Sequence, residues 1–132
     1  QATFAPNLAT NQTPEWWLAA HGWTNNFDAA ALADPDTDGY PTWQEYIADT
    51  DPNDPQSHPR LTHIDLLTDP ATRPILLWPA STARTYTIEY TDDLLTGTWT
   101  TQHLNLGASQ WTDTNPPPLT NRTYRLSPRL PP

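Results

Sequence analysis

Four carboxylates and a glycine lie at regular positions between residues 34 and 45. Asp34, Asp36 and Asp38 alternate, Gly39 follows directly, and Glu45 comes seven residues after Asp38. In proteins, calcium takes about six to eight hard oxygen ligands. A chain that winds around such an ion turns alternate side chains toward it, and glycine permits the sharp bend that must follow. The spacing therefore predicts a calcium-binding loop.

The expected calcium ligands extend beyond the carboxylates. Position 7 of the loop would supply a backbone carbonyl, position 9 would act directly or through water, and position 12 would close the site with both carboxylate oxygens. The full predicted set is Asp34, Asp36, Asp38, Tyr40, Thr42 and Glu45. The alternative is a solvated acidic turn, which four carboxylates spaced around a glycine do not favour.

A second acidic segment follows, and two interpretations of it stay open. Asp49, Asp51, Asn53 and Asp54 could form a second cation site, with Asp51 and Asp54 as the leading candidates. Alternatively, these side chains make local hydrogen bonds within a turn, as Asp and Asn do routinely beside proline.

Short helices are expected on both sides of the loop. Thr13 and Pro14 predict the start of a helix, as cap and first residue, and Gly22 predicts its end. A second helix is expected over residues 28–33, leading directly into the acidic loop. Thr42 can cap a third helix, from Trp43 to about residue 48. The loop would thus lie between two helices.

The loop with its helices resembles an EF-hand, and residues 14–57 resemble exported bacterial modules related to dockerin and thrombospondin type 3 calcium repeats. The resemblance rests on Trp16-Trp17, on the segment 34–46 and on the turn TDPNDP at 50–55. It implies an exported calcium-binding module. Paired EF-hands use the backbone N–H at loop position 8, which here is Pro41 and has none. Because a second complete loop is also missing from the sequence, we expect a permanently filled structural site and not a sensor.

Beyond a proline-rich break at residues 57–60, the helical signals end and strand signals begin. Hydrophobic and threonine-rich stretches are separated by Gly, Asp-Pro and Pro-Pro-Pro turns, which is typical of an all-β unit. The expected strands are residues 61–67, 73–78, 84–91, 98–103, 109–113 and 122–127.

This part resembles a fibronectin type III domain. The resemblance rests on Trp78, on the alternating segment 86–90, on Trp99 and on Tyr124 in the corner-tyrosine role. Such a sandwich usually has seven strands, whereas about six are expected here. Pro128 and the residues after it are not expected to continue a regular paired strand. The last strand would then be missing, which leaves an open sheet edge.

Residues 1–12 are expected to form an extended N-terminal arm. Ala2, Phe4 and Leu8 lie at even positions, as on an extended chain with one apolar side. The arm could cover the open edge in its own molecule or in a neighbour, and the second case would build a head-to-tail filament. The alternative is a tail without fixed structure.

Composition excludes several classes of protein. A net charge of −9, with no Lys, argues against a nucleic-acid partner, and eight of the fifteen acids fall between Asp28 and Asp54. There is no Cys for thiol chemistry, no apolar run long enough to span a membrane, and no recognisable catalytic motif. Gln1 is interpreted as the residue left after signal-peptide removal, although a trimmed chain would look the same. A secreted, extracellular or cell-surface protein without enzymatic activity is expected.

The sequence as a whole predicts an α+β protein with an arm at 1–12, a helical calcium unit at 13–57 and an incomplete antiparallel β-sandwich at 61–128. The expected function is that of a calcium-stabilised structural subunit of an extracellular filament or surface assembly, self-associating through the open edge. The alternative is an accessory or carbohydrate-binding C-terminal module of a larger exported hydrolase, with a polysaccharide as partner. Seven Trp suggest that alternative, but buried core positions explain most of them.

Overall fold

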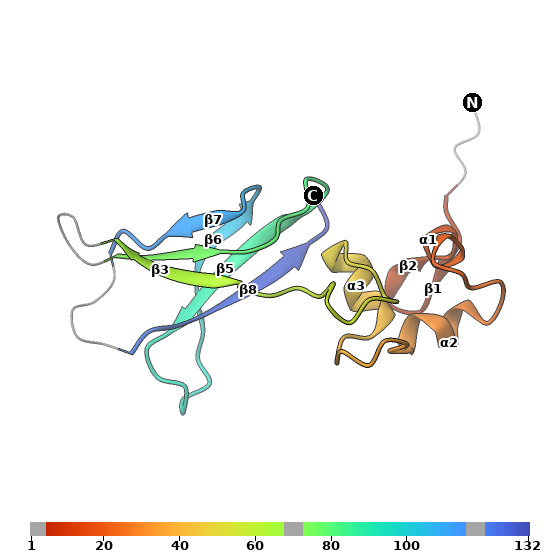
Figure 1. The fold of residues 1–132 in the computed structure, drawn as a ribbon, viewed down its shortest axis with the longest axis horizontal. Helices are drawn as coiled ribbons and strands as arrows, with labels where there is room; N and C mark the ends of the chain where they lie inside the picture. The colour runs from red at the N-terminus through yellow and green to blue at the C-terminus, as the bar shows by residue number, and fades with distance from the viewer. Residues whose placement is uncertain (1–4, 68–72, 116–120) are drawn as a thin grey trace. The chain divides into compact units, whose positions relative to one another are not determined.

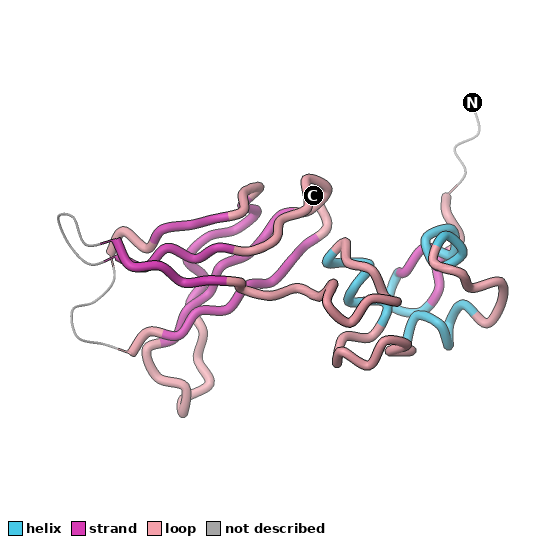
Figure 2. The backbone as a smooth tube through the Cα atoms, in the orientation of Figure 1, coloured by secondary structure: helices cyan, strands magenta, loops and turns pink. Residues whose placement is uncertain are grey.

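A computed structural model describes residues 5–67, 73–115 and 121–132. Its chain divides into two compact units, residues 1–58 and 59–132, so the boundary lies inside the break predicted at 57–60. The described residues form helices only in the first unit and their longer strands only in the second (Figure 1, Figure 2). The three sheets that they form are all antiparallel, so the fold is α+β, as predicted. None of the helices in these ranges is long and apolar enough to cross a membrane.

The helical unit consists of short elements. They are β1 (Leu8–Ala9), the 3-10 helix η1 (Thr10–Gln12), β2 (Thr13–Pro14), α1 (Glu15–Ala20), α2 (Phe27–Leu32) and α3 (Thr42–Ala48). Helices of this length are marginal on their own, so tertiary packing must hold them. The predicted order of three helices is confirmed, with boundaries that shift by one or two residues.

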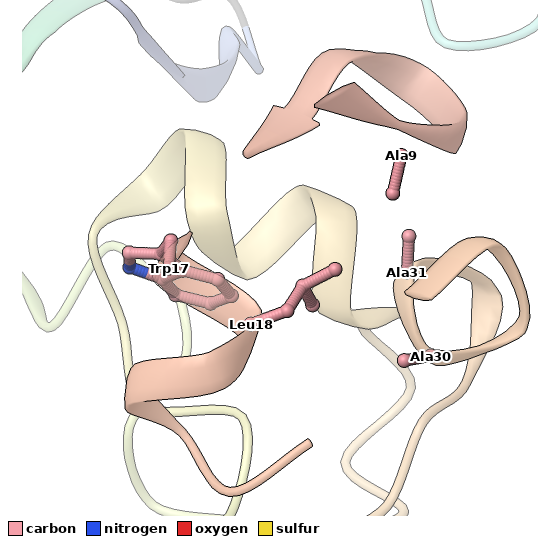
Figure 3. Close-up of a cluster of buried hydrophobic side chains, with 5 residues drawn as sticks. All are labelled: Ala9, Trp17, Leu18, Ala30 and Ala31. Atoms are coloured by element: carbon pink, nitrogen blue, oxygen red, sulfur yellow. The ribbon is translucent and has the colours of Figure 1, made fainter. Parts of the chain in front are cut away.

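Small residues let these short helices pack closely. Trp17 and Leu18 of α1 are buried, and Ala9 of β1 faces Ala31 of α2 (Figure 3). Trp16, the neighbour of Trp17, is 61% exposed, whereas Trp17 is 6% exposed. The two neighbouring Trp side chains therefore have different environments.

The segment before α1 differs from the expected arm. Leu8 and Ala9 pair with Pro14 and Thr13, and the backbone N–H of Glu15 donates to the Asn7 carbonyl over 2.9 Å. Asp28 of α2 also holds η1, because its Oδ1 accepts from both the backbone N–H and the hydroxyl of Thr10. Residues 7–12 therefore belong to the helical unit. Leu8 is 47% exposed on a hairpin strand, and Ala2 and Phe4 lie outside the described residues.

The helix starts also differ from the prediction. Thr13 belongs to β2 and its hydroxyl donates to the Thr10 carbonyl, so it does not cap α1, and Pro14 takes the cap position instead. Likewise Pro41 precedes α3, and Thr42 is the first helical residue. Extended backbone at a proline suits a cap position, because φ is already fixed and no N–H is lost.

All six strands predicted for the second unit are present. They are β3 (His63–Leu67), β4 (Arg73–Leu77), β5 (Thr85–Thr91), β6 (Thr100–Leu106), β7 (Gln110–Thr112) and β8 (Thr123–Arg129). They form two three-stranded sheets, in the orders β3-β4-β7 and β6-β5-β8. Side chains from both sheets build one core around Leu76, Trp78, Tyr86 and Ile88.

The last strand continues further than expected. β8 runs through Pro128 to Arg129, and these residues pair with Tyr86 and Thr85 of β5. The expectation that pairing ends at Ser127 is therefore wrong. The reason is the position of β8 at the edge of its sheet, where a proline without an N–H is tolerated.

Candidate metal centre

The acidic loop joins the end of α2 to the start of α3. Gly39 has φ +95°, which confirms the need for a residue without a side chain at the bend. The Thr42 backbone N–H and hydroxyl both donate to the Ala33 carbonyl, each over 2.8 Å. This pair of bonds joins the two ends of the loop.

Each of the four predicted carboxylates uses one oxygen to brace the loop. The donors are backbone N–H groups for the three Asp and a hydroxyl for Glu45. The bonds are Gly39 N to Asp34 Oδ2 (3.1 Å), Asp38 N to Asp36 Oδ1 (3.3 Å), Tyr40 N to Asp38 Oδ1 (2.9 Å) and Thr50 Oγ1 to Glu45 Oε1 (3.2 Å). These bonds orient the carboxylates and leave their other oxygens available.

Those other oxygens are buried and accept no hydrogen bond. They are Asp34 Oδ1, Asp36 Oδ2, Asp38 Oδ2 and Glu45 Oε2. Burying a carboxylate oxygen without a partner is costly, so such groups normally bind a cation. Asp34, Asp36 and Asp38 also offer one oxygen each within 4.8 Å of one another. This acidic triad could hold a metal ion, and hard carboxylate oxygens suit calcium or magnesium best.

Glu45 is not part of the acidic triad, but the negative charges of the triad affect its pKa. The residue is fully buried, and burial is the main cause that raises its pKa to about 8, with the charges of Asp36, Asp38 and Asp34 adding to the effect. Burial and the neighbouring Asp38 and Asp34 also raise the pKa of Asp36. Both carboxyls are thus destabilised as anions until a positive charge joins them.

The other two predicted ligands have local roles in the structure. Thr42 is fully buried, and its hydroxyl proton is directed at the Ala33 carbonyl. Tyr40 contributes its backbone N–H to Asp38. That these two residues also contact the ion stays a prediction.

Two residues near the loop were missed by sequence reasoning. Thr50 supports Glu45 through both its hydroxyl and its backbone N–H, which donates to the Glu45 carbonyl over 3.1 Å. His58 approaches Asp38, with 3.2 Å between His58 Nδ1 and Asp38 Oδ2. Thr50 is the first residue of the TDPNDP turn, on which the resemblance to calcium-binding modules partly rests. That turn was therefore the sequence feature that could have indicated a supporting role for Thr50.

The second acidic segment makes the local hydrogen bonds that were predicted if it forms a turn and not a cation site. Asp51 Oδ1 accepts from the Asn53 N–H, and Asp54 Oδ1 accepts from the Gln56 N–H. Asp49 has a left-handed backbone (φ 61°) at the end of α3. Within the described ranges, the acidic triad is the only group of three or more His, Asp or Glu close enough to share a cation. A second cation site therefore gains no support.

Charge is distributed unevenly between the two units. All six Arg and six of the fifteen acids lie in residues 59–132, which makes that unit formally neutral. The whole net charge of −9 therefore belongs to residues 1–58, which contain no Lys or Arg. A polyanion is thus disfavoured as a partner of the helical unit, and a divalent cation is favoured.

Comparisons with known proteins give no match to this chain, whether with protein-family models, curated proteins or solved structures. The assignment of the site therefore rests on its own residues.

The raised pKa of Glu45 predicts that cation binding depends on pH. At pH 6 a proton on Glu45 competes with the cation, and at pH 8 it is half lost. Affinity should rise between pH 6 and 8, approaching about tenfold per pH unit for one displaced proton. In the cation-free protein, rising pH has the opposite effect, because it lowers the stability of the fold. The folded pKa exceeds the ordinary value of 4.5, so this group's stabilisation is complete below that value and lost as pH rises through 8.

Calcium titration calorimetry at several pH values measures this dependence, and Glu45→Gln serves as the matched variant because it cannot lose a proton. The variant should bind weakly with a flat pH profile between 6 and 8. A wild-type affinity that does not change over this range would contradict the assignment of Glu45 as a ligand.

Proposed function

We propose that this chain is a secreted, calcium-stabilised structural protein without enzymatic activity. The observation that carries the proposal is the set of four carboxylates, each with one oxygen that accepts a hydrogen bond and another that is buried and accepts none. Calcium is the cation of choice because the donors are all oxygens in a loop that tolerates irregular geometry. Extracellular calcium is abundant enough to keep a site of modest affinity filled.

We infer an EF-hand-like loop that works as a permanent brace. Its two flanking helices, α2 and α3, are joined directly by the hydrogen bonds from Thr42 to Ala33. Pro41 has no backbone N–H with which to pair a second loop. Calcium would therefore hold α2 against α3 continuously instead of switching them.

The β-unit supports a fibronectin type III-like sandwich that lacks its last strand. Of the four edge strands, β7 has only three residues, and the pairing of β6 with β5 is interrupted by two register shifts. Such bulges normally protect an edge against further pairing. β8, in contrast, pairs with β5 over seven consecutive residues without a shift. The remaining edge strand, β3, pairs with β4 over only five residues. The outer side of β8 is therefore the longest regular edge that could accept a strand.

We propose that residues 1–6 of a neighbouring molecule supply this strand. Among the described residues, Asn7 is the first with a hydrogen bond to the helical unit, and the six residues that precede it in the sequence include Ala2 and Phe4. Tyr124 and Leu126 lie on β8 and are only partly buried against the core, so an apolar residue of the incoming strand would cover them.

Negative-stain microscopy tests this assembly. In calcium the chain should form linear particles, whereas deletion of residues 1–6 should leave monomers with unchanged calcium affinity, because the metal loop is untouched. Uniformly monomeric wild-type particles in calcium would contradict self-association and favour an accessory module.

A carbohydrate-binding accessory module is the second candidate. The specific observation in its favour is Trp16, which is exposed while the other six Trp are buried or half-buried. A single exposed Trp is a weak platform for a polysaccharide, since sugar sites normally combine an aromatic face with converging polar groups. The structural role is therefore preferred.

A further inference from the structure

His58 lies against the metal loop at the point where the helical unit ends. Its ring stacks on Tyr40, with 5.8 Å between the ring centroids and 8° between the planes. Its Nδ1 lies 3.2 Å from Asp38 Oδ2, the buried oxygen that accepts no hydrogen bond. The His58 side chain is 24% exposed and that of Asp38 only 3%. Two residues of the loop are thus covered by the last residue before the β-unit.

The chain between α3 and His58 is folded so that this contact is made. The Asp51 N–H donates to the Ser57 hydroxyl over 2.9 Å, and the Ser57 N–H donates to the Asp54 carbonyl over 2.8 Å. His58 Nδ1 also lies 3.0 Å from the Pro55 carbonyl oxygen, which accepts a hydrogen bond from it. Pro59 then restricts His58 to extended backbone. The turn therefore brings the chain back to the metal loop at His58.

We propose that His58 is a positioning residue of the calcium loop, through which the bound ion orders the connection between the two units. The proposal rests on the calcium function proposed above. When the ion holds Asp38 and the adjoining Tyr40 in place, His58 has a fixed surface to pack on. Without the ion, the mutually repelling carboxylates spread, and His58 loses both contacts. Hydrogen-bonding and packing partners of ligating carboxylates usually change metal affinity when removed.

Amide relaxation of the full-length chain tests this inference. In wild-type protein, the heteronuclear NOE of Ser57, His58 and Arg60 should be high in calcium and fall clearly in chelator. His58→Ala should give low values in both conditions and bind calcium about tenfold more weakly. His63→Ala, an exposed histidine on β3, is the matched control and should behave like the wild type.

Two conservative variants separate the contacts. His58→Phe keeps the ring stack and should retain order at residues 57–60, with weaker calcium binding. His58→Asn keeps a short N–H donor and should bind calcium better than His58→Ala while leaving the connection less ordered. If His58 acts by packing alone, His58→Phe should bind calcium like the wild type and His58→Asn should bind it no better than His58→Ala, which would contradict a role for the contact with Asp38.

The outcomes separate this inference from the calcium proposal. If calcium shifts the amide signals of residues 34–45 but leaves residues 57–60 equally ordered with and without it, the role of His58 is wrong and the metal site stands. If residues 57–60 still become ordered on calcium binding in His58→Ala, the role of His58 is likewise wrong and the metal site stands. If calcium shifts none of the loop signals, the metal site fails and the role of His58 fails with it.

Discussion

Chelation of calcium is expected to lower the melting temperature of the helical unit by about 15–30 °C. A ligand present at a thousandfold excess over its dissociation constant adds about 4 kcal/mol to the free energy of unfolding. For a unit of this size, each kcal/mol corresponds to about 4–8 °C. The helical unit depends strongly on this contribution, because its three helices have only six or seven residues each. Calorimetry of the full chain in calcium and in chelator measures the shift.

A pair of Glu→Gln variants distinguishes metal binding from general destabilisation. Glu45→Gln should abolish most of the calcium-dependent shift while leaving the melting temperature in chelator near the wild-type value. The reason is that Glu45, with its pKa raised to about 8, is already largely protonated in the metal-free protein at pH 7. Glu15→Gln removes the same charge from the first turn of α1 and should preserve the shift. An unchanged melting curve in excess chelator would refute the structural role of calcium.

Local patterns predicted the elements of this protein well. Hydrophobic and threonine-rich stretches between turn residues located all six strands of the β-unit, and the spacing of carboxylates around Gly39 located the loop. These signals succeed because they depend on the periodicity of a strand and on the steric freedom of glycine, which are local properties. The four carboxylates of the candidate site could therefore be predicted from their spacing alone.

Contacts between distant residues were not predictable in the same way. The bonds from Thr10 to Asp28 cross eighteen positions and turn an expected arm into part of the helical unit. His58 lies twenty residues beyond Asp38 and meets it only because the intervening turn folds back. The pairing of Pro128 depends on its edge position, which follows from the order of strands in the sheet. In each case the decisive information is tertiary.

Substitution of Asp113 by Ala is expected to destabilise the β-unit by about 3–5 kcal/mol. Asp113 is fully buried directly after β7, and its Oδ2 accepts from Arg122 Nη1 over 3.0 Å and from the Tyr124 hydroxyl over 2.7 Å. Arg122 is only 10% exposed and also lies over the Tyr90 ring, 3.6 Å from its centroid. Removing Asp113 therefore leaves a largely buried guanidinium without one acceptor and the partly buried Tyr124 hydroxyl without its partner. Denaturant unfolding in calcium, with the helical unit fully folded, measures the loss.

The same network supplies its own controls. Asp92 binds Arg122 through both oxygens, and this hydrogen bonding lowers the pKa of Asp92, but its side chain is 41% exposed. Asp92→Asn should therefore cost far less than Asp113→Ala, since water replaces much of what is lost. Adding Arg122→Met to Asp113→Ala should recover part of the stability, because an apolar side chain suits the buried site better than an unpaired charge. If the double variant is as unstable as the sum of its single changes, the network does not act as a unit, and Asp113 stabilises the sheets by packing alone.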